Sequence, residues 1–155
     1  MRSPEEPIHP LVGGWRLQSW VAIAEDGTES SPMGDAPDGL LAYTADGTMI
    51  GIMGRSDRPR FGADDVTGGS EAERARAFAS FIAYGGRYEV HGTTVTHHVE
   101  TSLFPNWIGT RQDRRWELDI SGRQLSLTSP PIELGGARLV QRLCWERLPP
   151  DGLPD

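Results

Sequence analysis

The stretch that decides the fold is TTVTHHVETSLFPNWIGT, which runs from Thr93 to Thr110. Its first part alternates between apolar and polar residues, as a half-buried β-strand does. One face carries Val95, His97, Val99, Thr101 and Leu103, and the other carries Thr94, Thr96, His98, Glu100 and Ser102. The first face is the more apolar, so we expect it to point inward. A shift of one residue would exchange the two faces, so His98 and Glu100 stay alternatives to His97 as interior residues.

Seven further segments have the pattern of short strands separated by turn signals. They are residues 14–23, 40–44, 48–53, 87–90, 110–120, 123–128 and 139–147, and the first carries Trp15, Leu17, Ser19 and Val21 on one face. The Asp46-Gly47 pair marks a hairpin. The 19 Gly and 12 Pro residues fit many turns between short strands better than a helical bundle. The sequence therefore predicts an all-β fold, with about eight strands closing into an antiparallel barrel.

One helix is expected between the predicted strands 48–53 and 87–90. Ser70 and Glu73 have the spacing of a capping box, in which each side chain binds the other residue's backbone N–H. We expect the helix to run to Ala83 with an apolar stripe and to end at Gly85-Gly86. The stripe consists of Ala75, Phe78, Phe81 and Ile82.

Composition limits the partners and the organisation of the chain. Its 155 residues fit a flexible arm (1–10), one barrel domain (11–148) and a flexible tail (149–155). The net charge of -7 and the pI of about 5.1 argue against nucleic acid or an anionic membrane as partner. Cys144 is the single cysteine, so no internal disulfide forms. With no hydrophobic signal region in MRSPEEPIHP and no apolar membrane span, we expect a cytoplasmic protein.

Several polar side chains fall on faces that should point into the barrel. A small ligand would satisfy them, so we predict a pocket for a small, hydrophobic molecule with a polar group. The predicted ligand-binding residues are Tyr88, Thr101, Trp107, Gln112, Arg114 and Trp116. Arg114 could clamp an anionic oxygen. Trp107 could rim the pocket mouth, cap the barrel end or contact a second copy in a homodimer.

His97 is the candidate catalytic residue, because histidine exchanges a proton near neutral pH. The alternative is a structural histidine hydrogen-bonded to Tyr88 or Thr101. No metal is expected, since His97 and His98 point to opposite faces. The sequence contains no nucleophile elbow, phosphate-binding loop or dinucleotide fingerprint, so no cofactor is expected.

The order of these motifs resembles the lipocalin-like domain family of bacteria and fungi. Gly13-Gly14-Trp15 is similar to the Gly-x-Trp opening of lipocalins, and the likeness continues through residues 39–47, 57–61, 84–90 and 97–107. The resemblance implies an up-and-down barrel, open at one end and closed at the other by Trp15. An arginine near the last strand, for which Arg147 is the candidate, would cover Trp15.

The resemblance leaves the function open. Some related barrels in natural-product pathways catalyse ring closure or isomerisation, which suggests a cofactor-free isomerase or cyclase for a polyketide- or terpenoid-like metabolite. The alternative is a non-catalytic binding or carrier protein for a small hydrophobic ligand. An interaction module that uses Trp107 as a contact is a third possibility.

Overall fold

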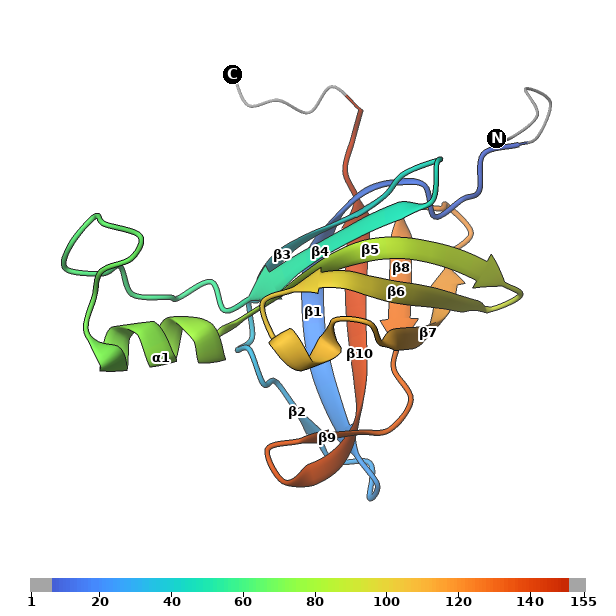
Figure 1. Ribbon diagram of the computed structural model, residues 1–155. Coiled ribbons are helices and arrows are strands. Elements are labelled where there is room, and N and C mark those ends of the chain that lie inside the picture. The colour runs from blue at the N-terminus through green and yellow to red at the C-terminus, as the bar shows by residue number, and fades with distance from the viewer. Residues whose placement is uncertain (1–6, 151–155) are drawn as a thin grey trace.

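Ten strands and two short helices follow one another along residues 7–150, which are the part of the chain that the computed structural model describes (Figure 1). The first half contains β1 (Gly13–Ala24), β2 (Glu29–Ser30), β3 (Asp38–Tyr43), β4 (Thr48–Gly54) and α1 (Glu71–Ala79). The second half contains β5 (Phe81–His91), β6 (Thr94–Ser102), the 3-10 helix η1 (Pro105–Trp107), β7 (Arg111–Leu118), β8 (Gln124–Thr128), β9 (Ile132–Leu134) and β10 (Ala137–Arg147).

The sheet closes on itself, because the first long strand pairs with the last. The order is β2-β1-β3-β4-β5-β6-β7-β8-β10-β9, and β1 also pairs with β10. Without the short strands β2 and β9, which lie together at one end in Figure 1, eight antiparallel strands remain in the closed ring. This arrangement confirms the predicted up-and-down barrel of about eight strands.

The floor of the barrel is built around Trp15. Its ring is buried, and the guanidinium carbon of Arg147 lies 4.2 Å from the ring centroid, as the resemblance to lipocalins implied. Arg147 also donates to the carbonyl oxygens of Val12 at 2.8 Å and of Gly122 at 3.0 Å. One side chain therefore covers the tryptophan and joins the segment before β1 to the β7–β8 turn.

Two β-bulges change which side chains face the interior. In β1, Leu17 pairs with Trp145 and Ser19 with Cys144, so Gln18 is the extra residue. The buried residues beyond it are Trp20 and Ala22, and the predicted shared face of Trp15, Leu17, Ser19 and Val21 is wrong there.

The second bulge lies in β6, where Gly85 pairs with Thr101 and Gly86 with Val99. Glu100 is the extra residue, and the side chain of Thr101 is therefore exposed. The predicted inward orientation of Thr101 is wrong for this reason. Val95, His97 and Val99 are buried, as predicted, and His98 lies half-exposed on the outer face.

Helix α1 begins as predicted and ends earlier. Ser70 accepts a hydrogen bond from the backbone of Glu73, and Glu73 binds the backbone of Ser70, which forms the capping box. The helix ends at Ala79, and the chain continues as β5 from Phe81, so the predicted end at Gly85-Gly86 is wrong. These glycines permit close strand contact instead, since a Cβ on Gly86 would lie 2.0 Å from the carbonyl oxygen of His98.

The predicted arm contacts the barrel through His9. His9 packs edge-on against Trp116 with ring centroids 5.4 Å apart, and its Nδ1 accepts a hydrogen bond from the backbone of Leu11. Residues 1–6 of the arm and 151–155 of the tail lie outside the described part of the chain. The predicted domain boundaries stay a prediction.

Candidate functional site

A cavity of about 370 Å³ occupies the barrel interior. Its wall is mainly apolar and aromatic. Every strand of the closed ring contributes at least one side chain to it, and residues of α1, η1 and β9 complete it. The principal wall residues are Trp20, Leu41, Met53, Ile82, Tyr84, His97, Arg114, Leu127, Gln141, Leu143 and Trp145. The predicted interior pocket is therefore present.

The strand register gives the cavity a deep end and a mouth. Trp145 pairs with Leu17 near the Trp15 floor, whereas Gln141 pairs with Ala22 nearer the other end of β10. Apolar residues of α1, of the segment before η1 and of β9 surround the mouth and are partly exposed. They are Phe78, Leu103, Phe104 and Leu134. A hydrophobic molecule would meet an apolar surface before it enters.

His97 forms the polar centre of the wall, where two tyrosines hold its ring. Its Nε2 lies 2.6 Å from the hydroxyl of Tyr43 on β3, and its Nδ1 lies 2.8 Å from the hydroxyl of Tyr84 on β5. The predicted structural partners, Tyr88 and Thr101, are therefore wrong. Tyr84 and His97 both line the cavity, so the chain of hydrogen bonds ends at its surface.

Burial keeps all three groups uncharged. The pKa of His97 is lowered from its ordinary value of 6.5 to about 3, first by burial and then by the positive charges of Arg114 and His98. Burial raises the pKa of the Tyr43 hydroxyl well above 10, and it also raises the pKa of Tyr84. At neutral pH His97 is therefore a neutral ring with one donor and one acceptor nitrogen.

The hydroxyls of Tyr43 and Tyr84 contact opposite nitrogens of the His97 ring. A neutral ring has one donor and one acceptor nitrogen, so one tyrosine accepts a hydrogen bond from His97 and the other donates one to it. In the tautomer that carries its proton on Nδ1, His97 donates to Tyr84 and accepts from Tyr43, and the O–H of Tyr84 is left to donate to a ligand in the cavity.

Arg114 lines the cavity from β7, as predicted, and is braced by its neighbours. One guanidinium nitrogen donates to the side-chain oxygen of Gln112 at 3.1 Å, and another donates to the carbonyl oxygen of Asp113 at 2.8 Å. Gln112 also donates to Thr110 at 3.2 Å. Gln112 thus positions Arg114 and does not itself line the cavity.

Of the three aromatic residues predicted to bind the ligand, one lines the cavity and two lie elsewhere. Trp107 of η1 lines the mouth and packs edge-on against Tyr84 with ring centroids 5.5 Å apart. Tyr88 lies beside Tyr43 and donates to the carbonyl oxygen of Thr44 at 2.6 Å. Trp116 donates to the carbonyl oxygen of Gly92 at 3.0 Å. Neither Tyr88 nor Trp116 lines the cavity.

Sequence reasoning missed Trp20, Tyr43 and Tyr84 as site residues. Trp20 reaches the interior because of the bulge at Gln18, for which the sequence has no clear signal. Tyr84 lies just beyond the predicted helix end at Ala83, and Tyr43 lies in the predicted strand 40–44, so the sequence pattern alone marks neither as a site residue. A wider search for hydroxyls able to bind a buried histidine would have named the two tyrosines as candidates.

Outside the barrel, Glu89 bridges two histidines. Its carboxylate oxygens lie 2.6 Å from Nε2 of His98 and 3.0 Å from Nε2 of His91. Both hydrogen bonds lower the pKa of Glu89, and the one with His98 has the larger effect. Across residues 7–150, no cluster of three or more His, Cys, Asp or Glu side chains is arranged to hold a metal ion.

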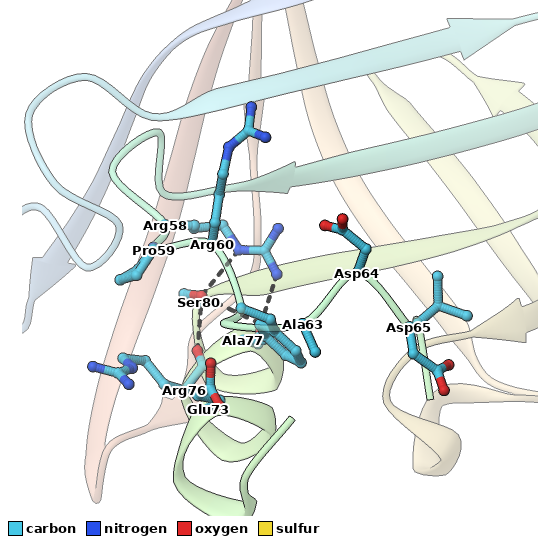
Figure 2. A pocket seen from close by; sticks show the side chains of 12 residues that line it. Arg58, Pro59, Arg60, Ala63, Asp64, Asp65, Glu73, Arg76, Ala77 and Ser80 are labelled. Atoms are coloured by element: carbon cyan, nitrogen blue, oxygen red, sulfur yellow. Dashed lines mark hydrogen bonds between the residues drawn. The ribbon is translucent and has the colours of Figure 1, made fainter. Parts of the chain in front are cut away.

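A second hollow, of about 430 Å³, lies between the 58–66 loop and α1. Figure 2 shows Arg58 reaching the end of α1, where it donates to Ser80 Oγ at 3.1 Å and to the carbonyl oxygen of Ala77 at 2.9 Å. Its guanidinium also lies 4.6 Å from the ring centroid of Phe81, which lines the barrel cavity. Arg58 therefore holds α1 beside the barrel mouth. Because its guanidinium is already engaged in these contacts, we place the candidate site in the barrel and not in this hollow.

Within the described residues, no helix has the length and apolar character needed to cross a membrane.

Comparison with known proteins identifies a family and a relative that resemble this chain. The family model of the lipocalin-like domain matches residues 12–148. The 4'-hydroxy-3'-methoxypropiophenone carrier protein ppsC of Aspergillus oryzae is 34% identical over 104 residues, which cover 61% of this chain and 92% of that protein. The fold, the Trp15 floor and the family match agree, and the chain belongs to the lipocalin-like domain family.

Proposed function

We propose that the protein binds and carries a small aromatic molecule in the barrel cavity. The observation that carries this proposal is a cavity of about 370 Å³ whose mainly apolar wall contains a polar group formed by His97, Tyr84 and Arg114. Small-molecule pockets commonly measure about 300 to 1,000 Å³, so the cavity suits a molecule of one or two rings. The aromatic wall residues Trp20, Trp107 and Trp145 favour a flat ring.

The relative from Aspergillus oryzae supports this choice. Its name describes a carrier of 4'-hydroxy-3'-methoxypropiophenone, a single aromatic ring with a phenol and a ketone. We propose the same chemical class, small phenolic aryl ketones, for this chain. Arg114 would attract a phenolate oxygen, and the O–H of Tyr84 would donate to an uncharged oxygen.

A carrier role also fits the protonation of His97. A general acid or base works best with a pKa near the working pH, and the pKa of His97 is about 3. Both of its ring nitrogens are already bound to tyrosines. This arrangement favours a fixed polar wall over proton exchange with a substrate.

A cofactor-free isomerase or cyclase is the second candidate function. The observation that favours it is the Tyr43–His97–Tyr84 chain of hydrogen bonds, which ends at the cavity and could support Tyr84 as a proton donor. In that case Tyr84→Phe would abolish conversion of a bound polyketide- or terpenoid-like metabolite. In a carrier, the ligand would be recovered unchanged from the wild-type protein.

Titration calorimetry with 4'-hydroxy-3'-methoxypropiophenone tests the carrier proposal directly. The wild-type protein should bind one molecule, and Leu143→Trp, which fills the cavity, should weaken binding by at least tenfold. Ile50→Trp is the control, because Ile50 is 55% exposed and lies away from the cavity lining. Binding that Leu143→Trp leaves unchanged would contradict the proposed location.

We keep two further expectations as proposals. A homodimer is supported by the exposed apolar residues Leu103, Phe104 and Ile108 around Trp107, and sedimentation velocity would test it. A cytoplasmic location and a lack of nucleic-acid binding are supported by the single Cys144 and the net charge of -7.

A further inference from the structure

Two buried N–H groups on β10 have no hydrogen-bond partner among residues 7–150, and both belong to residues that line the cavity. They are Nε2 of Gln141 and Nε1 of Trp145. The side chains are deeply buried, since Gln141 is 6% exposed and Trp145 is 1% exposed. A buried donor without an acceptor costs about 1 to 3 kcal/mol, so both positions call for a partner.

The orientation of the Gln141 amide follows from its neighbour. Trp20 Nε1–H donates to Oε1 of Gln141 at 2.7 Å. An indole nitrogen can only donate, so the amide oxygen must face Trp20 and the NH₂ group must face elsewhere. The unpartnered atom of Gln141 is therefore a donor and not an acceptor.

The backbone around Gln141 is also held in place. Its N–H donates to Ser129 Oγ at 2.9 Å, and its carbonyl oxygen accepts from the Ser129 N–H at 2.8 Å. With the side chain held by Trp20, the free NH₂ group is fixed before any ligand arrives. A donor prepared in this way binds an acceptor at a low cost in conformational entropy.

We propose that Nε2 of Gln141 binds a carbonyl oxygen of the ligand and thereby selects aryl ketones over alkyl-substituted aromatics. This inference rests on the proposed function, because it assigns the polar contact within the same cavity. A carbonyl oxygen suits the position because it accepts strongly and brings no hydrogen that would need a partner in the apolar wall. Arg114 and Tyr84 add further donors, so the cavity favours ligands rich in acceptors.

The test compares two ligands that differ only at the carbonyl group. Titration calorimetry with 4'-hydroxypropiophenone and 4-propylphenol measures the preference for the ketone. We expect the wild-type protein to prefer the ketone by about three- to tenfold, the usual range for one hydrogen bond. In Gln141→Met the ketone should bind about as weakly as the alkyl phenol. Gln124→Met is the control, because Gln124 is exposed on β8 and should leave the preference unchanged.

The outcomes separate this inference from the proposed function. If the wild-type protein binds neither ligand, the proposed function fails. If it binds both equally well, or if Gln141→Met weakens both ligands by the same factor, the carrier function stands and the role of Gln141 is overturned.

Infrared spectroscopy tests the inference even if Gln141→Met does not fold. The carbonyl stretch of ¹³C=O-labelled 4'-hydroxypropiophenone bound to the wild-type protein should move to lower frequency than in an apolar solvent. A stretch at the apolar-solvent position would show that the carbonyl accepts no hydrogen bond, which contradicts the proposal.

Discussion

The hydroxyl of Tyr84 lies 2.8 Å from Nδ1 of His97, and both residues form part of the cavity wall. This pair joins the buried Tyr43 to the surface that a ligand would touch. It therefore links the stability of the barrel to the chemistry of the cavity. Variants of His97 can distinguish a structural role of this residue from a catalytic one.

Replacing His97 with Gln should lower the free energy of unfolding by about 1 to 3 kcal/mol, because a Gln cannot reach both tyrosines as the ring does. Chemical denaturation measures this loss. The control is His98→Gln on the half-exposed outer face, where we expect a change below about 1 kcal/mol. A His97→Gln protein that is as stable as the parent and binds ligand equally well, but loses turnover of a substrate, would favour the catalytic role.

Stability should fall as the pH is lowered below 6.5. In the unfolded chain His97 takes up a proton near its ordinary pKa of 6.5, whereas in the folded protein its pKa is about 3. Between these values the unfolded state binds more protons, so acid favours unfolding. His97 should contribute up to about 1.4 kcal/mol per pH unit between about pH 6 and pH 4.5.

Denaturant titrations at several pH values measure that slope, with His97→Gln as the comparison. The other histidines contribute to both proteins, so the difference in slope isolates His97. Equal slopes in the two proteins would show that the folded pKa of His97 is not lowered.

The Trp15–Arg147 floor should matter for stability and not for ligand binding. Arg147→Lys keeps the charge but loses the planar group that covers Trp15 and donates to Val12 and Gly122, so we expect a loss of about 2 to 3 kcal/mol. Arg115→Lys, at an exposed ion pair with Glu117, should change stability by less than about 0.5 kcal/mol. A ligand affinity that falls tenfold in folded Arg147→Lys protein would disagree with this separation.

Gly86→Ala should destabilise the barrel strongly. The added Cβ would lie 2.0 Å from the carbonyl oxygen of His98 across the β6 bulge, so the strands would have to move apart. We expect a loss of about 2 to 4 kcal/mol, as for other backbone clashes in a core. Gly62→Ala is the matched control, because no atom lies within 4 Å of its added Cβ. Thermal unfolding of both variants tests the difference.

Trp107 and Trp116 should behave differently in ligand binding. Trp107 lines the cavity mouth, so Trp107→Ala should weaken binding of an aromatic ligand by about tenfold or more through lost apolar contact. Trp116 packs against His9 outside the cavity, so Trp116→Phe should leave affinity within about twofold. The reverse result in titration calorimetry would place the ligand elsewhere.

The sequence by itself determined the barrel, its floor and part of the site. Alternation along β6 placed Val95, His97 and Val99 inside, because side chains of a regular strand alternate between two faces. The Gly-x-Trp opening and Arg147 indicated the floor, and Ser70 with Glu73 determined the start of α1 through contacts only three residues apart.

Only the tertiary structure decided how the cavity wall is completed. The extra residues Gln18 and Glu100 reverse the alternation beyond them, and bulges depend on the paired strand as well as on local sequence. Trp20 thereby reaches Gln141, a residue 121 positions away, and Thr101 leaves the interior. The partners of His97 likewise come from β3 and β5, because a buried ring binds whichever hydroxyls barrel closure brings to it.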